Sequence, residues 1–546
     1  MAPPRLKKAK KNQQAKKLVD ADDYLASGDS NEEAMRKHRV GDPVKALRFA
    51  DRALEDYSQG IAKFPRSFDL AYNRARLLLE KGTDPVLSRA LSVPVMNVLE
   101  EALSSHHYAR DLEPENTDAL FNLAQVLTSM AETIAEDDEP NSFRACQLIK
   151  QALEAQSRCF NLQQSAFAKN RLELERAMRE SAQLQSEQVD SERDGINLAS
   201  ESRDTNQEEQ WVRIEEPITA TTLLETITAQ VEALSALCSI LSSSLASPPS
   251  LDESLATSLS WIDAYSTSLL TETLPALINE NREVLEPRLS DVILPKAVFI
   301  SNYLELSFRS STIDAEKYKT ELDAAFSQPG LDPASEDVLM ASVRALLSFN
   351  SALADLEQPN GAAAAINHHA ELRWNILVEA RRRLTSVSNI PDIDKHTAAE
   401  THLMRGDVSL LMQILAYPPW SYSQALATTP QLLKHAEVYY RNASRLVASV
   451  GLFDQAADED KIVCEFKGAM VSVLQQVTTD HATTSTSSSS DNSGAIIAVP
   501  ASADLLERAL GPFVKTQGGQ WVRDNIEDMI TEGMVAPAVF SALAQG

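Results

Sequence analysis

Apolar residues recur along most of the chain at intervals of three, four and seven positions, the spacing of one face of an α-helix. The clearest stretches are residues 67–82 (SFDLAYNRARLLLEKG) and 117–131 (TDALFNLAQVLTSMA), and each is followed by a second helical stretch with small residues seven positions apart. Those small residues are Ala102 and Ala109 after the first stretch, and Ala145 and Ala152 after the second. Small residues at that spacing let two helices approach closely, so the pattern predicts packed antiparallel helix pairs.

The first 165 residues divide into three such units, over 30–66, 67–116 and 117–165. The second and third units share an aromatic–Asn pair followed by alanine, and Pro114 ends the second unit. The shared residues are Tyr72-Asn73 with Ala75, and Phe121-Asn122 with Ala124; the first unit has Ala46 and Ala53, preceded by Ala34 and Gly41. This arrangement resembles the tetratricopeptide repeat (TPR), a helix–turn–helix unit of about 34 residues.

The resemblance implies an all-α fold, a right-handed superhelix of helix pairs, whose first helices line a groove that binds an extended peptide or a helix. In that register the groove residues are Tyr72, Asn73, Arg76, Phe121, Asn122 and Gln125. An Asn side chain hydrogen-bonds a peptide backbone through both halves of its amide. The same residues could instead hold adjacent repeats together, and this alternative stays open.

The units also depart from the family's pattern. The first unit has Ser30 at its opening position, where the family has a large residue, and the second and third units carry insertions between their helices. One subfamily grips the C-terminal carboxylate of heat-shock chaperones with Lys, Arg and Asn side chains. Only Asn73 falls on a plausible position of that clamp, so a heat-shock co-chaperone adaptor is disfavoured.

Beyond the repeats, composition and apolar spacing divide the rest of the chain. Further helices are predicted after a charged stretch, with TAAETHLMRGDVSLLMQIL placing a turn at Gly406-Asp407 as in the first repeats. The predicted segments are a basic disordered arm (1–19), TPR-like repeats (20–170), a charged linker (171–217), a degenerate TPR-like helical region (218–476), a Ser/Thr-rich linker (477–500) and a small helical segment (501–546).

Composition supports a helical protein without a disulfide framework, and its charge distribution favours basic partners. Glycine is scarce, at 16 of 546 residues, and the four cysteines are scattered without a CxxC pair, as in a reducing compartment. The chain carries −27 overall, yet its first 17 residues carry seven basic side chains and no acidic one, so the remainder carries −34. The basic residues of the arm are Arg5, Lys7, Lys8, Lys10, Lys11, Lys16 and Lys17. A body this acidic attracts basic partners, and nucleic acid could contact only the arm.

No catalytic, cofactor or metal constellation stands out. Phosphate-binding glycine loops, GxSxG and HExxH are absent, and the adjacent pairs His106-His107 and His368-His369 point about 100° apart on a helix. Of the tryptophans, Trp261, Trp374 and Trp420 are predicted to pack in cores. Trp211, in EEQWVRIEEP, is predicted to dock onto the chain's own helical body or onto a partner.

The sequence therefore predicts a non-enzymatic interaction scaffold or dedicated chaperone, which binds a basic client protein in its groove. It predicts no small-molecule substrate and no membrane span, because no run approaches about 18 apolar residues, and a cytosolic or nuclear location. A structural subunit of a larger assembly is the alternative from another class.

Overall fold

The computed structural model describes residues 18–137, 141–191, 217–245, 252–355, 363–449, 455–485 and 500–540. The basic residues of the predicted arm, Trp211 and most of the Ser/Thr-rich segment lie outside these ranges. The described chain is helical and contains no strand, which confirms the all-α, helical-repeat-like prediction. It forms two compact units: unit 1 comprises Met1–Ile240 and Ala256–Arg288, and unit 2 comprises Leu241–Leu255 and Leu289–Gly546.

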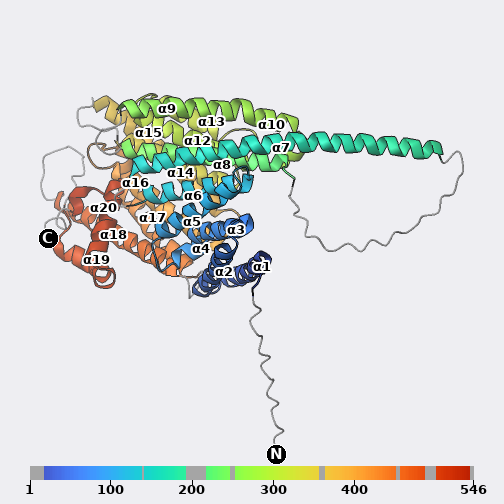
Figure 1. The fold of residues 1–546 in the computed structure, drawn as a ribbon. Coiled ribbons are helices and arrows are strands. Elements are labelled where there is room, and N and C mark those ends of the chain that lie inside the picture. The colour runs from blue at the N-terminus through green and yellow to red at the C-terminus, as the bar shows by residue number, and fades with distance from the viewer. Residues whose placement is uncertain are drawn as a thin grey trace, which may run out of the picture. The chain divides into compact units, whose positions relative to one another are not determined.

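Unit 1 is a stack of antiparallel helix pairs (Figure 1). The pairs are α1 with α2, α3 with α5, and α6 with α7; α8 packs on α7, and α9 on α8. The bounds are α1 (Ala21–His38), α2 (Pro43–Lys63), α3 (Phe68–Thr83), α4 (Pro85–Arg89), α5 (Val95–Leu112), α6 (Thr117–Ala135), α7 (Ser142–Ser191), α8 (Ala220–Leu245), α9 (Asp252–Thr267), the π-helical turn η1 (Ser268–Thr273), α10 (Leu274–Glu280), α11 (Arg282–Leu285) and the 3₁₀ turn η2 (Glu286–Arg288).

Short polar side chains start several of these helices. Asp42 accepts a hydrogen bond from the backbone N–H of Lys45 at 3.0 Å, and Pro43 occupies the first turn, where its missing N–H costs nothing. Asp84 and Pro85 begin α4 in the same way, inside the loop that the sequence marked as an insertion. Asn116 caps α6 through the N–H of Ala119 at 3.1 Å. The capped turns explain why the chain reverses direction at these points.

The predicted small residues lie where helices meet. All of the following are completely buried: Ala46, Ala53, Ala75, Ala102, Ala109, Ala124, Ala145 and Ala152. The register of the first unit was wrong, however, because its first helix begins at Ala21 and contains Tyr24 and Gly28 upstream of Ser30. Gly41 lies exposed in the loop, with open space around it, and the close helix contact is at Gly28 instead.

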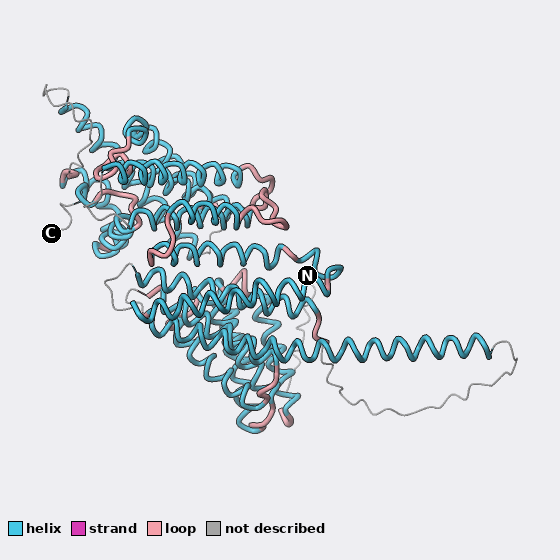
Figure 2. Tube along the Cα trace, turned by 90° about the horizontal axis from the view of Figure 1, so that it is seen from above, coloured by secondary structure: helices cyan, strands magenta, loops and turns pink. Residues whose placement is uncertain are grey.

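Helix α7 is the longest element, at 50 residues. It continues past the third predicted unit and through the first part of the segment predicted as a linker. Its distal half extends beyond the other helices of unit 1 as a single helix (Figures 1 and 2).

Unit 2 is also built of successive helices around one apolar core. Its elements are α12 (Ser290–Arg309), α13 (Ala315–Ala325), α14 (Glu336–Asp355), α15 (Ala363–Ser388), α16 (Lys395–Ile414), α17 (Ser423–Val447), α18 (Gln455–Ser485), α19 (Ala503–Gln517), α20 (Gly519–Thr531) and the 3₁₀ turn η3 (Pro537–Phe540). Trp374 and Trp420 are buried in this core, as predicted, whereas Trp261 of unit 1 is only half-buried. The predicted turn at Gly406-Asp407 was wrong, because α16 runs through both residues.

The two units share one packing arrangement. A β-carbon on Gly28 of α1 would overlap the ring of Tyr57 from α2, and a β-carbon on Gly406 of α16 would overlap the ring of Tyr440 from α17. In each case the tyrosine hydroxyl donates to a carboxylate on the glycine's own helix. Glycine is therefore required mid-helix, since only a missing side chain lets the ring reach the backbone.

The carboxylate in each arrangement also holds a cation from the following helix. In unit 1, Tyr57 donates to Glu32 at 2.7 Å, and Arg76 of α3 pairs with the same carboxylate. In unit 2, Tyr440 donates to Asp407 at 2.7 Å, and Lys467 of α18 lies 2.9 Å from that carboxylate. Each set therefore links three consecutive long helices.

Two described helices, α8 and α14, are long and apolar enough to cross a bilayer by length and composition, although the sequence predicted no such run. Within the protein, 67% and 61% of their most apolar windows are buried, as expected of core helices.

The glycine contacts give the first prediction. Gly28→Ala and Gly406→Ala each lower the free energy of unfolding by about 1–3 kcal/mol, because the added methyl group forces the tyrosine ring out of place. In an ordinary helix interior the same change raises stability by up to about 1 kcal/mol. Urea unfolding followed by circular dichroism measures the difference.

Gly468→Ala in α18 is the matched control, since its nearest outside atom would lie 3.9 Å away, at ordinary contact distance. It keeps or raises stability. Gains of equal size at Gly28, Gly406 and Gly468 would contradict the role assigned to the two tyrosines.

Candidate protein-binding face

The six groove residues predicted from the sequence lie on α3 and α6, the first helices of the second and third pairs. The structure brings two of them together: the Nδ2 of Asn122 donates to the hydroxyl of Tyr72 at 3.0 Å. The ring of Tyr72 also stacks on Phe68, with 5.5 Å between ring centroids, and burial, followed by the charge of Asp118, raises its pKa. Tyr72 and Asn122 therefore hold α3 against α6.

Arg76 is likewise engaged inside the protein. Its guanidinium pairs with Glu32 of α1 and lies 3.4 Å from Glu80, one turn along α3. Glu32 is 1% exposed and also holds Arg36 at 2.7 Å and the hydroxyl of Tyr57. Burial, followed by the bond to Glu32, raises the pKa of Tyr57. A carboxylate this deeply buried needs these donors, because an unpaired buried charge is strongly destabilising.

Sequence reasoning missed Glu32. Its signal was the glycine four positions earlier, Gly28, which stands one helical turn away on the same face. That signal becomes meaningful only when the ring of Tyr57 is known to lie across the glycine.

The other three predicted residues remain available. Asn73 and Phe121 are partly exposed and Gln125 is exposed, and within the described chain none of the three has a hydrogen-bond, ion-pair or ring partner. They offer two amide groups and one apolar surface on the side of α3 and α6 that also presents the Tyr72–Asn122 bond. We refer to Asn73, Phe121 and Gln125 as the binding face.

Carboxylates continue the binding face along α6. Glu132 and Glu136 follow Gln125 at steps of seven and four, so they lie on the same side of the helix. Burial, then the charges of Glu136 and of Glu232 from α8, raise the pKa of Glu132; burial also raises the pKa of Glu232. In the part of the chain that the structure describes, no cation pairs with these three carboxylates, so their mutual repulsion is uncompensated.

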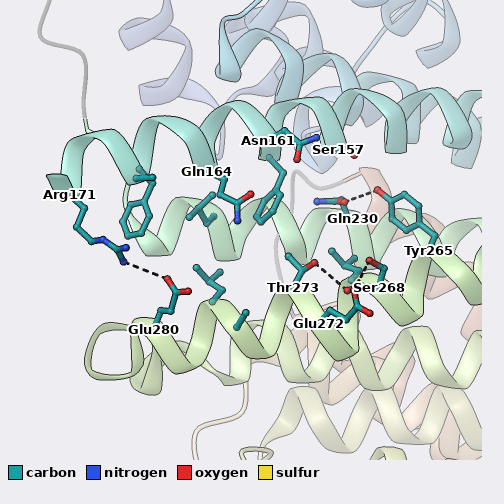
Figure 3. Close-up of a pocket in the computed structure, with 17 residues that line it drawn as sticks. Ser157, Asn161, Gln164, Arg171, Gln230, Tyr265, Ser268, Glu272, Thr273 and Glu280 are labelled. Carbon is teal, nitrogen blue, oxygen red and sulfur yellow. Dashed lines mark hydrogen bonds and ion pairs between the residues drawn. The ribbon is translucent and has the colours of Figure 1, made fainter. Parts of the chain in front are cut away.

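A separate cavity of about 510 Å³ opens between α7, α8, α9, η1 and α10 (Figure 3). Its polar groups include Asn161, Gln164 and the Arg171–Glu280 pair at 3.5 Å, and Tyr265 donates to Gln230 at 2.7 Å. Burial raises the pKa of Tyr265 to about 12. The lining contains the carboxylates of Glu272 and Glu280 and no His, Cys or Lys.

Elsewhere the titratable groups serve packing. Within the described ranges no three His, Cys, Asp or Glu side chains gather to hold a metal ion. All four cysteines are free, and burial raises the pKa of Cys159 to about 12 and that of Cys146 to about 11. His106 is fully buried, and desolvation, with a smaller effect of His107, lowers its pKa to about 4.

Comparison with known proteins gives limited information. No family model matches the chain. Over 180 residues, 33% of its length, the chain is 32% identical to UPF0656 protein C926.02 of Schizosaccharomyces pombe, and the match spans only 38% of that protein. Among solved structures, the S. pombe nuclear import adaptor Nro1 aligns with 81% of this chain and 99% of its own, at 10% identity and a TM-score of 0.30. That superposition supports no conclusion about function.

The buried histidine gives a pH prediction. The folded pKa of His106 lies below its ordinary value of about 6.5, so the folded state takes up the proton less readily than the unfolded state. Stability from this residue is complete above about pH 6.5 and falls as the pH drops toward 4. In His106→Leu, the loss of unfolding free energy between pH 7.5 and pH 4.5 shrinks by on the order of 2 kcal/mol, measured by urea unfolding at both pH values. An unchanged pH dependence would contradict this assignment.

The Glu32 contacts give a second prediction. Arg76→Ala lowers the free energy of unfolding by about 2 kcal/mol, because it leaves a buried carboxylate short of one donor. Arg36→Ala is the matched control: Arg36 contacts the same carboxylate but its side chain is 49% exposed, against 30% for Arg76. It costs less than about 1 kcal/mol. Equal losses in the two variants would show that Arg76 has no special structural role.

Proposed function

We propose that the chain is a non-enzymatic protein-binding scaffold, of the dedicated-chaperone type, whose client lies on the binding face of α3 and α6. The observation that carries this proposal is that Asn73, Phe121 and Gln125 have no partner inside the described chain, although their neighbours Tyr72, Arg76 and Asn122 do. Free amides beside a partly exposed ring suit a peptide backbone with an apolar side chain.

A basic client is favoured by the charges next to the binding face. The charges of Glu136 and Glu232 repel the carboxylate of Glu132, and a lysine or arginine from a partner would relieve that repulsion. The formal charge of −34 outside the first 17 residues acts in the same direction at longer range. Glu132 and Glu136 lie about two and about three turns beyond Gln125 along α6, and Glu232 acts on Glu132 from α8, so the client would cross the amides first and place its cation about two to three turns further on.

Two parts of this proposal are still predictions from the sequence: that the helix pairs are TPR-like repeats, and that the protein is cytosolic or nuclear. A heat-shock adaptor is less well supported, since Arg76 is held by Glu32 and only Asn73 is left as a candidate clamp residue. A fixed subunit of a larger assembly would present the same free amides, so the two must be separated by experiment.

The test is affinity purification of the full-length chain from its own cells, washed at low salt and at about 0.5 M salt, where charges are screened within about 4 Å. One basic protein is recovered near equal stoichiometry at low salt and is lost at high salt. The double variant Asn73→Ala/Gln125→Ala recovers about tenfold less of it, since two hydrogen bonds are lost. Glu132→Gln/Glu232→Gln binds less as well, and the salt dependence weakens.

Gln151→Ala is the matched control, because Gln151 is an exposed amide on α7, which is the second helix of its pair and not part of the binding face. It leaves recovery unchanged. A salt-stable set of several proteins, indifferent to all of these variants, would identify the chain as a fixed subunit and reject the binding face.

A further inference from the structure

The distal half of α7 carries an uncovered apolar stripe. Leu174 and Met178 are 57% and 60% exposed and have no partner among the described residues. They continue the helix face of Phe160 and Phe167, since 160, 167 and 174 are seven positions apart and 178 is one turn further. Inside unit 1 that face is covered: Phe160 is 9% exposed, and both phenylalanines line the cavity of Figure 3.

The apolar face of α7 is covered by α8 inside unit 1, and this cover stops at the N-terminal end of α8, Ala220. Thr226 of α8 donates to Gln163 of α7 at 2.7 Å, and Gln230 reaches Tyr265, which lies beside Ser157. The two helices are therefore antiparallel, and the first residue of α8, Ala220, lies near the level of Ala168 to Arg171. Beyond Arg171, α7 has lost its covering helix while its apolar face continues.

The chain itself supplies a candidate cover. Residues 192–216 join the end of α7 to Pro217, which lies just before the start of α8. Trp211 stands six residues before Pro217 and thus within about 20 Å of it, which equals about 13 residues of helix. That reach includes Leu174 and Met178. The sequence around it, QWVRI, holds the only tryptophan of the connection, and a second apolar stretch, GINLA, lies at 195–199, farther from Pro217 along the chain.

Charge favours the same placement. Glu215 and Glu216 immediately precede Pro217 in the sequence, and Pro217 lies three residues before α8, whose first residue is near the level of Arg171. Arg171 points from the stripe side of α7 toward the cavity (Figure 3), and its present partner, Glu280, is a surface residue 3.5 Å away. Such an exposed pair is weak, so the guanidinium can accept a second carboxylate.

We infer that the segment around Trp211 docks on the apolar stripe of α7, with Trp211 covering Leu174 and Met178 within the same chain. This is an interaction surface separate from the binding face, and it does not depend on the proposed client. A second copy of the chain or a partner protein could occupy the same stripe, and the experiment separates these cases.

The experiment is hydrogen–deuterium exchange of the full-length chain at two protein concentrations tenfold apart. Amides of residues 210–216 exchange at least about tenfold more slowly than an unstructured peptide, equally at both concentrations. Leu174→Ser/Met178→Ser removes this protection. Trp211→Ala removes it at the neighbouring positions, whereas Trp211→Phe retains most of it, because a second aromatic ring still covers the stripe.

Leu172→Ser is the matched control. Leu172 is 55% exposed, but it lies on the opposite side of α7 from Leu174 and Met178, so its loss leaves the protection intact. Unprotected amides in the wild-type chain, or protection that survives Leu174→Ser/Met178→Ser, would overturn the inference. Protection that rises with concentration, together with a dimer in sedimentation, would overturn it in favour of a second copy.

Discussion

Both units depend on a tyrosine ring that lies directly against the backbone of a neighbouring helix at a glycine. The ring brings its hydroxyl to a carboxylate on that helix, and the carboxylate in turn takes a cation from the next helix. Replacing such a polar set with apolar residues need not cost stability, since desolvation offsets much of the charge attraction. The set instead fixes how the helices are aligned, because the hydroxyl, the carboxylate and the cation can bond to one another only when the three helices are in one axial register. One set therefore aligns the two helices of a pair and also aligns the pair with the helix that follows.

The sets differ in a way that shows what is constrained. Glu32 stands four residues after its glycine, whereas Asp407 directly follows Gly406. The longer Glu side chain spans a full turn to reach Tyr57, and the shorter Asp reaches Tyr440 from the adjacent position. What the two units share is therefore the contact of a hydroxyl, a carboxylate and a cation. Different residues at different spacings make that contact in each unit. A sequence comparison of the two units would not detect it.

Helix pairing could be predicted from the sequence, whereas these glycine–tyrosine contacts could not. Buried alanines such as Ala102 and Ala109 follow from apolar spacing alone, because any packed helix pair needs small residues at its contact. Gly28 and Gly406 could not be recognised this way, since a glycine beside an aspartate suggests a turn and the opposing tyrosine lies 29 or 34 residues away. Helix starts at which Asp precedes Pro, as at Asp42 and Asp84, carry a local signal, although the stretch after Asp84 was predicted only as an insertion between helices. The length of α7 could not be predicted, because beyond Met178 its sequence has few apolar residues at helical spacing, the pattern by which a packed helix is recognised.

The predicted groove residues show the same limit on a smaller scale. Tyr72, Asn73 and Arg76 on α3 occupy the same repeat positions as Phe121, Asn122 and Gln125 on α6, so spacing alone could not separate the residues that stack helices from those left free. The two groups differ in their partners: Glu32 engages Arg76 and Tyr72 engages Asn122, while within the described chain Asn73 and Gln125 have no hydrogen-bond or ion-pair partner. The uncompensated carboxylates next to these free residues lower the stability of the isolated chain slightly, because Glu136 and Glu232 repel Glu132. A surface that only packed helices together would gain by replacing one of these carboxylates with a cation, whereas in the proposed function the uncompensated charge attracts a lysine or arginine of the client.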